Sequence, residues 1–322
     1  ADFEAGLSVI DASEPTTPTE VGSYVTPGEA MGVAIAGNHA YIANRYKGLR
    51  IIDISDVSTL TETGSYVTPG YAEDVAVAGN HAYIADAYGG LFIIDMSDPT
   101  LPVEAGTYNT PEYACGVELV QEYAYVADRY SGLHVIDVSN PSIPTEVGSY
   151  PTSGAAWDVA VAGTYAYAAE DIGLQIIDAE DPTTLTDTGS YPTPGRITGV
   201  AMSGPYAYVA ANRDGLRVIN LVNPAAPTEI GVCDAPRFAS DATVVETYAY
   251  VSDIYEGLYV IDVSNPATPT ETGSYNPPGT VYDVVVTGTY AYVAADGLHI
   301  IDVSNPANPT GAGHYDTPGN AL

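Results

Sequence analysis

Aspartate recurs at one position of the sequence where it could bind a cation. Aligned copies of a repeated segment place Gly32, Asp74, Gly116, Asp158, Gly199, Asp241 and Asp283 there. Hard cations take oxygen ligands, so Asp74, Asp158, Asp241 and Asp283 are candidate ligands of Ca²⁺. The alternative is that each aspartate accepts hydrogen bonds from backbone N–H groups where a strand begins, and binds nothing.

Aromatic and basic residues lie in the same segments as these aspartates. They are Tyr71, Trp157, Arg196, Phe238 and Tyr282. Apolar rings with a few convergent polar groups are typical of small-molecule pockets. Together with the four aspartates, these residues form a candidate site for a cation or a sugar-like ligand. Neighbouring segments add further mixed charge and aromatic character through Asp86, Arg129, Asp171, Arg213 and Tyr255, a composition that also suits a protein partner.

The sequence contains no recognisable catalytic set. His39 and His81 occupy a position that other copies fill with tyrosine, and His134 and His299 occupy another variable position. No histidine pairs in sequence with a nucleophile, and the Gly-x-Ser-x-Gly, phosphate-loop and His-Glu-x-x-His motifs are absent. The prediction is therefore a non-enzymatic protein with no catalytic residues. Because paired carboxylates can serve sugar chemistry, the alternative is a Ca²⁺-dependent carbohydrate-binding protein, hydrolase or lyase.

One unit is copied along the whole chain. The string Gly-Leu-x-(Ile/Val)-Ile-(Asp/Asn) occurs eight times, and its last residue is Asp11, Asp53, Asp95, Asp137, Asp178, Asn220, Asp262 and Asp302. A period so regular leaves no room for a linker. It predicts a single domain over residues 1–322, with units at 1–24 (half a unit), 31–66, 73–108, 115–150, 157–191, 198–233, 240–275 and 282–315.

Each unit is predicted to contain four short strands, illustrated by residues 74–79, 82–85, 91–95 and 103–108. The first three are apolar on both faces, which predicts sheets buried between neighbours. The fourth follows proline and carries a carboxylate, as expected of a protected edge strand. Four strands in about 42 residues are typical of a propeller blade. The first strand should therefore line a central channel and the fourth should form the rim of an all-β propeller.

The strand count is uneven, because there are seven first and second strands but eight third and fourth strands. The simplest interpretation is an eight-bladed propeller with one incomplete blade, and a seven-bladed propeller is the alternative. An incomplete blade exposes a strand edge, and a second chain could pair with it. Self-assembly into fibres or layers is therefore a further hypothesis.

Two kinds of loop are predicted to share the variable face of such a propeller. They connect the fourth strand to the next first strand, and the second strand to the third. The loops of the other face are nearly identical among copies, for example Val-Ser-Asn-Pro at residues 138–141. Scaffold positions must repeat whereas binding positions need not, so the variable face is expected to bind a protein or glycan partner.

Several repeated residues are predicted to be structural. The Asp that ends each third strand should accept N–H groups of the following turn, and Asn220 could form the same bond. The Gly before Leu should require positive φ or close backbone approach. Cys115 and Cys233 fall on inner and outer strands of different units, which are too far apart for a disulfide. Both should therefore be free thiols.

The charge excludes several classes of partner. The chain has 8 Lys and Arg residues against 41 Asp and Glu residues, a net charge of −33. Such a surface repels nucleic acid and anionic membranes, and no apolar run reaches the roughly 20 residues of a membrane helix. Adaptation to high salt is another explanation of the acidity.

Segments such as Gly132-Leu-His-Val-Ile-Asp-Val-Ser-Asn-Pro141 and Gly257-Leu-Tyr-Val-Ile-Asp-Val-Ser-Asn-Pro266 resemble the LVIVD-repeat family. The flanking Ala-Tyr-Val-Ala strand and the Thr-Pro-Gly turn strengthen this resemblance, which covers the entire chain. It implies a β-propeller from a bacterial or archaeal secreted or cell-surface protein, and no particular reaction. The function expected on this basis is adhesion, recognition, or envelope or filament structure.

Overall fold

The computed structural model describes residues 5–193, 195–317 and 321. The described residues form 30 strands and no helix. They build seven four-stranded antiparallel sheets and one two-stranded sheet, in agreement with four predicted strands in each complete unit and two in the first. No helix able to span a bilayer occurs in this part of the chain.

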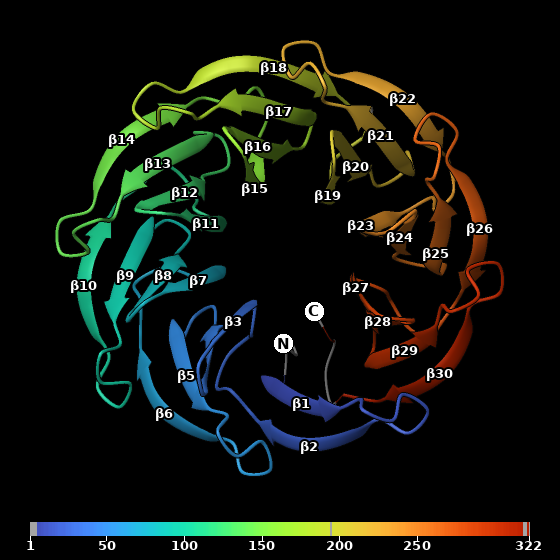
Figure 1. Ribbon diagram of the computed structural model, residues 1–322. Coiled ribbons are helices and arrows are strands. Elements are labelled where there is room, and N and C mark those ends of the chain that lie inside the picture. Colours follow the sequence, from blue (N-terminus) through green and yellow to red (C-terminus); the bar gives the residue numbers. More distant parts are fainter. Residues whose placement is uncertain (1–4, 194, 318–320, 322) are drawn as a thin grey trace. The chain divides into compact units, whose positions relative to one another are not determined.

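The strands follow one another in every sheet, so that chain neighbours are also hydrogen-bonded neighbours (Figure 1). The two-stranded sheet contains β1 (Leu7–Asp11) and β2 (Thr19–Tyr24). The next three sheets contain β3 (Gly32–Ala36), β4 (His39–Ala43), β5 (Leu49–Asp53) and β6 (Thr61–Tyr66); β7 (Asp74–Ala78), β8 (His81–Ala85), β9 (Leu91–Asp95) and β10 (Val103–Tyr108); and β11 (Gly116–Val120), β12 (Tyr123–Ala127), β13 (Leu133–Asp137) and β14 (Thr145–Tyr150).

The remaining four sheets repeat this order. They contain β15 (Ala156–Ala162), β16 (Tyr165–Glu170), β17 (Gly173–Asp178) and β18 (Thr186–Pro192); β19 (Gly199–Ser203), β20 (Tyr206–Ala210), β21 (Leu216–Asn220) and β22 (Thr228–Cys233); β23 (Ala239–Val245), β24 (Tyr248–Asp253), β25 (Gly257–Asp262) and β26 (Thr270–Tyr275); and β27 (Asp283–Thr287), β28 (Tyr290–Ala294), β29 (Leu298–Asp302) and β30 (Thr310–Tyr315).

The chain forms two compact units. The N-terminal unit comprises Ala1–Val9, Val21–Glu170 and Gln175–Thr188, and the C-terminal unit comprises Ile10–Glu20, Asp171–Leu174 and Gly189–Leu322. Within the N-terminal unit the first strands β3, β7, β11 and β15 contact one another in succession, and β19, β23 and β27 do so within the C-terminal unit. That the whole chain is a single domain stays a prediction.

The core of each unit lies between successive sheets. Apolar residues of the second and third strands supply it, because both faces of these strands are covered. Leu49 and Ile51 of β5, for example, pack in one cluster with Ile84 of β8 and Ile94 of β9. All four side chains are fully buried, so each sheet is stabilised chiefly by its neighbours.

The first strands are less buried than the sequence analysis predicts. Ile35 of β3 is 69% exposed and Val285 of β27 is 56% exposed. A first strand pairs with the second strand along one edge only, so protein surrounds its side chains on fewer sides. The prediction of burial on both faces is therefore correct for the second and third strands and wrong for the first.

The predicted turn after each third strand is confirmed. Asp53 Oδ1 accepts the N–H group of Ser55 at 2.8 Å, and the same bond follows the other third strands. Asn220 forms it with Val222 at 2.9 Å, so the position requires an acceptor oxygen rather than a charge. The glycine before each Leu is also explained: Gly48 has φ +67, and a Cβ on it would lie 2.3 Å from the Tyr66 carbonyl oxygen.

Candidate binding face

Backbone bridges join the loops that the sequence analysis assigns to one face. The loop after a second strand pairs with the segment at or just before the start of the next sheet's first strand, at Arg45–Ala72, Ala87–Ala114, Arg129–Ala156 and Asn212–Ala239. The first three bridges lie in the N-terminal unit and the fourth in the C-terminal unit. In each unit these loops therefore form one surface, which we call the loop face.

Buried polar side chains hold the loop face in place. Asp86, directly after β8, is fully buried. It accepts hydrogen bonds from the Thr68 hydroxyl and, at 2.7 Å, from the Gly70 N–H group. Burial raises the pKa of Asp86 to about 6. Asp128 forms the matching bonds with Thr110 at 2.9 Å and the Glu112 N–H group at 2.8 Å, and Asn44 donates to Thr26 at 2.7 Å. Asp86 thus holds two loops together through hydrogen bonds. We call its position, which Asn44, Asp128 and Asp253 occupy in other repeats, the latch position.

Aromatic rings and guanidinium groups stack on the loop face of the N-terminal unit. Tyr71, a predicted site residue, packs edge to face on Tyr46 with ring centroids 4.7 Å apart. The Arg45 guanidinium lies 5.3 Å from the Tyr46 centroid and 5.9 Å from that of Tyr71. Arg45 also forms an ion pair with Glu29. The arginine and both tyrosines are therefore held as one cluster.

A second stack surrounds Arg129. Its guanidinium lies 3.8 Å from the Tyr113 ring centroid and 4.5 Å from that of Trp157, so the predicted site residue Trp157 is part of this stack. Tyr88 packs edge to face on Tyr113 at 5.0 Å, and the Tyr113 hydroxyl donates to Glu73. No ion pair of Arg129 is present among the described residues, and aromatic faces replace a carboxylate as its neighbours.

The loop face of the C-terminal unit carries a similar cluster. Phe238, another predicted site residue, packs edge to face on Tyr255 at 5.0 Å. The Arg213 guanidinium lies 5.6 Å from the Phe238 centroid. Of the two remaining predicted site residues outside the aspartate set, Arg196 is exposed and Tyr282 is half-buried.

The loop-face tyrosines follow a simple rule, although only Tyr255 of the four is named among the residues of the predicted variable face. Tyr46, Tyr88, Tyr130 and Tyr255 each stand two residues after the latch position. Tyr88, Tyr130 and Tyr255 are 70%, 73% and 64% exposed. The signal in the sequence was the constant offset from Asn44, Asp86, Asp128 and Asp253.

The candidate aspartates bind backbone groups at the starts of the first strands. Asp74 accepts the N–H group of Val75 at 2.8 Å and that of Val117, in the next sheet, at 3.0 Å. Asp158 accepts the N–H group of Val159 at 2.8 Å. Desolvation of the carboxyl groups by the surrounding protein raises the pKa of both, and the charge of Asp74 adds to the effect on Asp158. This is the backbone-binding arrangement considered as the alternative to metal binding.

Asp241 and Asp283 differ from the other pair because they occupy the same position in consecutive sheets of the C-terminal unit. Burial, a hydrogen bond with Asp283 and the charge of Asp283 together raise the pKa of Asp241 to about 8. Asp241 therefore keeps its proton at neutral pH, because ionising a carboxyl group beside another carboxylate is costly. Among the described residues, no group of three or more His, Cys, Asp or Glu side chains is arranged around a common metal position. A Ca²⁺ site formed by Asp74, Asp158, Asp241 and Asp283 stays a prediction.

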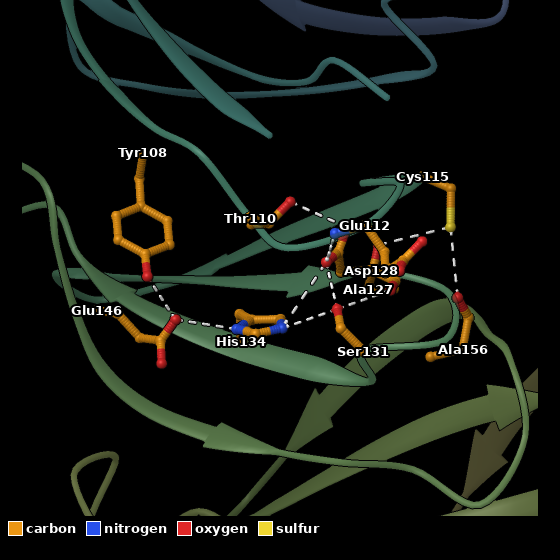
Figure 2. A network of polar contacts seen from close by, with 10 residues as sticks. All are labelled: Tyr108, Thr110, Glu112, Cys115, Ala127, Asp128, Ser131, His134, Glu146 and Ala156. Carbon is orange, nitrogen blue, oxygen red and sulfur yellow. Dashed lines mark hydrogen bonds and ion pairs between the residues drawn. The ribbon is translucent and has the colours of Figure 1, made fainter. Parts of the chain in front are cut away.

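One hydrogen-bonded chain resembles the Ser–His–carboxylate arrangement of hydrolases (Figure 2). The Ser131 Oγ lies 2.9 Å from His134 Nε2, and His134 Nδ1 lies 3.0 Å from Glu146 Oε2. This assembly was not predicted from the sequence, because Glu146 belongs to the neighbouring strand β14. The sequence feature that could have identified this contact is the constant spacing of 12 residues between the third-strand donor and the fourth-strand carboxylate. Arg50 bonds Glu62 and Arg217 bonds Glu229 at this spacing.

Comparison among the repeats favours a structural role for this chain. In other repeats, the position of His134 is occupied by Arg50, Gln175 and Arg217. Each of them forms a hydrogen bond with the equivalent fourth-strand carboxylate of its own repeat. Moreover, Ser131 donates its hydroxyl proton to Asp128, whereas a hydrolase serine gives its proton to histidine. His134 therefore acts as a donor that links two strands.

Comparison with protein families identifies the repeat. The model of the LVIVD repeat matches residues 1–26, 27–68, 69–110, 111–152, 153–193, 194–235, 236–277 and 278–317. The chain belongs to the LVIVD-repeat family. The resemblance inferred from the sequence is thereby confirmed. No curated protein matches this LVIVD-repeat chain.

Solved structures similar to the LVIVD-repeat chain establish its fold class. The computationally designed Ika8 protein is 9% identical with a TM-score of 0.75, covering 92% of this chain and 90% of its own. BamB from Moraxella catarrhalis is 14% identical with a TM-score of 0.68 and coverages of 86% and 83%. The Pan2 WD40 domain from Neurospora crassa is 16% identical with a TM-score of 0.60 and coverages of 90% and 91%. WD40 repeats form four-stranded blades, so the predicted β-propeller class is confirmed.

Proposed function

We propose that this LVIVD-repeat chain is a non-enzymatic binding protein that recognises a partner protein through its loop face. The observation that carries the proposal is the position of the positive charge. Two of the eight Lys and Arg residues, Arg50 and Arg217, lie on third strands and bond fourth-strand carboxylates. The other six lie on the loop-face loops: Arg45, Lys47, Arg129, Arg196, Arg213 and Arg237.

The physical character of the loop face supports protein recognition. Tyr and Arg are enriched at protein interfaces, because each offers a large contact area and directional hydrogen bonds. Here the rings and guanidinium groups are already stacked, so little side-chain freedom is lost on binding. On the remaining surface, acidic residues greatly outnumber basic ones. An aromatic surface that carries most of the positive charge of such an acidic molecule is suited to selective contact.

The location outside the cell is part of the same proposal. A chain with 41 acidic residues and Lys47 as its single lysine suits a salty exterior, and adhesion or envelope recognition would be its role there. A similar solved chain belongs to the structure titled Mitotic Checkpoint Complex, at 12% identity and a TM-score of 0.63. This supports only the general suitability of the fold for protein assembly.

The test compares one loop-face variant with a matched variant of the opposite loops. The first carries Tyr88→Ser, Arg129→Ala and Tyr130→Ser. The second carries Val57→Ser, Leu101→Ser and Ile143→Ser, on loops between third and fourth strands. Each protein is immobilised and exposed to surface extracts of the native organism and to a glycan array. Specific protein capture by the wild type and the second variant, lost in the first, is expected. Equal capture by all three, or glycan binding alone, would contradict the proposal.

A second hypothesis, self-assembly, rests on the two-stranded sheet. Strand β1 has one hydrogen-bonded neighbour, β2, among the described residues. A strand edge of this kind can pair with another chain. Light scattering over a wide concentration range tests the hypothesis: a mass that grows with concentration is expected, and a constant monomer mass rejects it.

A further inference from the structure

A tyrosine–carboxylate bond recurs between consecutive fourth strands. The tyrosine that ends one fourth strand donates its hydroxyl to the carboxylate near the start of the next. The bonds are Tyr24–Glu62 (3.0 Å), Tyr66–Glu104 (2.8 Å), Tyr108–Glu146 (2.6 Å), Tyr191–Glu229 (2.5 Å) and Tyr315–Glu20 (3.0 Å). In several repeats the carboxylate also accepts a bond from the third strand, as Glu146 does from His134 at 3.0 Å. The carboxylate therefore has two donors in a fixed arrangement.

The last sheet lacks this carboxylate. Gly311 pairs with Ile301 in the β29–β30 ladder, whereas Glu62 pairs with Ile52 and Glu271 pairs with Ile261 at the corresponding places. Gly311 thus stands where other repeats have Glu or Asp. The two donors remain: Tyr275 ends β26, and His299 occupies the third-strand position that Arg50 and His134 occupy elsewhere.

A cavity replaces the absent side chain. It has a volume of about 400 Å³ and is lined by residues that include Tyr275, Asp296, His299, Gly311, His314 and Asp316. The rings of His299 and His314 are stacked, with centroids 5.8 Å apart and planes at 13°. A Cβ on Gly311 would lie 2.3 Å from the Tyr275 hydroxyl oxygen. The hydroxyl therefore reaches into the place of the absent side chain, and the Tyr275 ring must shift to admit a larger residue at position 311.

The donors around this cavity have no acceptor of their own. Among the described residues, neither the Tyr275 hydroxyl nor the His299 ring forms a hydrogen bond. In other repeats the same two positions bind a carboxylate that the chain itself supplies. We propose that the cavity binds the carboxylate group of a small organic acid. This group takes the place of the Glu or Asp side chain that other repeats have at the position of Gly311.

The dimensions and charges of the cavity define the ligand class. The volume exceeds that of acetate and accommodates an acid with a ring, in the range of small-molecule pockets. His299 and His314 can donate to an anion, and stacked parallel rings do not direct their nitrogens at one metal ion. Asp296 and Asp316 oppose an anion, so the binding is weak, with a dissociation constant of about 1 mM. The site lies between strands β26, β29 and β30 and borders loop-face loops through Pro278, Asp296 and Asp316.

The experiment uses benzoate as the probe and neutral benzamide as its isosteric counterpart. The side-chain resonances of His299 and His314, assigned with His299→Gln and His314→Gln variants, are followed by NMR at constant ionic strength. Benzoate should shift both resonances in a saturable way. Benzamide should bind about tenfold more weakly, because a charge-assisted hydrogen bond is stronger than a neutral one. Equal binding of the two probes, or no shift at about 50 mM benzoate, overturns the proposal.

Two variants test the position of the bound group. Gly311→Glu restores the side chain found in other repeats and should abolish benzoate binding, while Thr310→Glu adds the same charge at an exposed neighbouring residue and should change affinity by no more than about threefold because solvent screens it. Tyr275→Phe removes one donor without adding bulk and should weaken binding about tenfold. Unchanged benzoate binding in Gly311→Glu, or in Tyr275→Phe should the first variant not fold, rejects the proposed site.

Discussion

Carboxylates in this chain have two opposite environments at the scale of single residues. Asp53 is bound by the Ser55 hydroxyl and N–H groups in an exposed turn, which lowers its pKa. Asp241 is half-buried beside Asp283, which raises its pKa to about 8. The first kind stabilises the folded state when ionised and the second destabilises it. The pH dependence of stability is therefore expected to contain two contributions of opposite sign.

Asp241→Asn should flatten the pH dependence of stability near neutrality. An unfolded aspartate has a pKa of about 3.9, so between about pH 4 and about pH 8 the folded chain retains a proton that the unfolded chain releases. Wild-type stability should fall through this window and then level off. The variant cannot ionise and should gain stability relative to the wild type as the pH rises from 5 to about 8.

Chemical denaturation at several pH values measures this effect, with Asp53→Asn as the control. The pKa of Asp53 is lowered, so its contribution is lost only as the pH falls below about 4. The control should therefore follow the wild-type slope between about pH 5 and about pH 8. Parallel curves for Asp241→Asn and the wild type would contradict a proton retained on Asp241.

Ser131 is expected to be inert as a nucleophile. A fluorophosphonate probe should not label the folded chain, because Asp128 accepts the Ser131 proton. Intact-protein mass spectrometry measures labelling. An adduct that disappears in Ser131→Ala would show that the Ser131–His134–Glu146 chain is catalytic.

The same chain of contacts should contribute to stability. Glu146→Ala leaves His134 and Tyr108 without their acceptor and should cost about 1–3 kcal/mol. His134→Gln should cost less, since Gln175 performs this role in another repeat at 3.0 Å from Asp187. Denaturant titration distinguishes the two, and a greater loss for His134→Gln would contradict the structural role.

Loops and strands depend on the buried latch residues at the scale of elements. Asp86→Ala removes the acceptor of Thr68 and Gly70 in a fully buried position. It should cost about 2–3 kcal/mol and increase amide hydrogen exchange in residues 67–72. Asp86→Asn should be milder, because Asn44 fills the same position in another repeat. Equal exchange in wild type and Asp86→Ala would show that the loop needs no latch.

The elements were predictable because their determinants are local and repeated. Every third strand ends at an acceptor, such as Asp53 or Asn220, that bonds the following turn, and the sequence displays this residue eight times. Exposure of Ile35 was not predictable in the same way. The exposure of this side chain depends on how many neighbouring elements cover the strand. The identity of an apolar residue does not indicate that number.

The residues of the aromatic clusters were partly predictable from the sequence, but their contacts were not. Variation among copies identified the segments that contain Tyr71, Trp157 and Phe238. The stacking of Arg129 between Tyr113 and Trp157 was not visible, because these rings come from loops of different sheets. Contacts between loop-face residues that are 16 to 40 positions apart in the sequence can be inferred only when the register of the sheets is known.

Net charge is the dominant property of the whole molecule. With a charge of −33, exposed carboxylates repel one another in the folded state, and salt screens this repulsion. The unfolding midpoint should therefore rise as NaCl increases from low concentration to about 0.5 M, where the Debye length is only a few ångströms. Calorimetry measures the midpoint, and a flat response would reject mutual repulsion as a destabilising force.

Hydrogen–deuterium exchange of the chain with a captured partner protein tests the central claim most directly. Protection should be confined to the loop-face loops, including residues 44–48, 86–90 and 128–132. Protection of the loops between third and fourth strands, or of the fourth strands alone, would contradict recognition through the loop face.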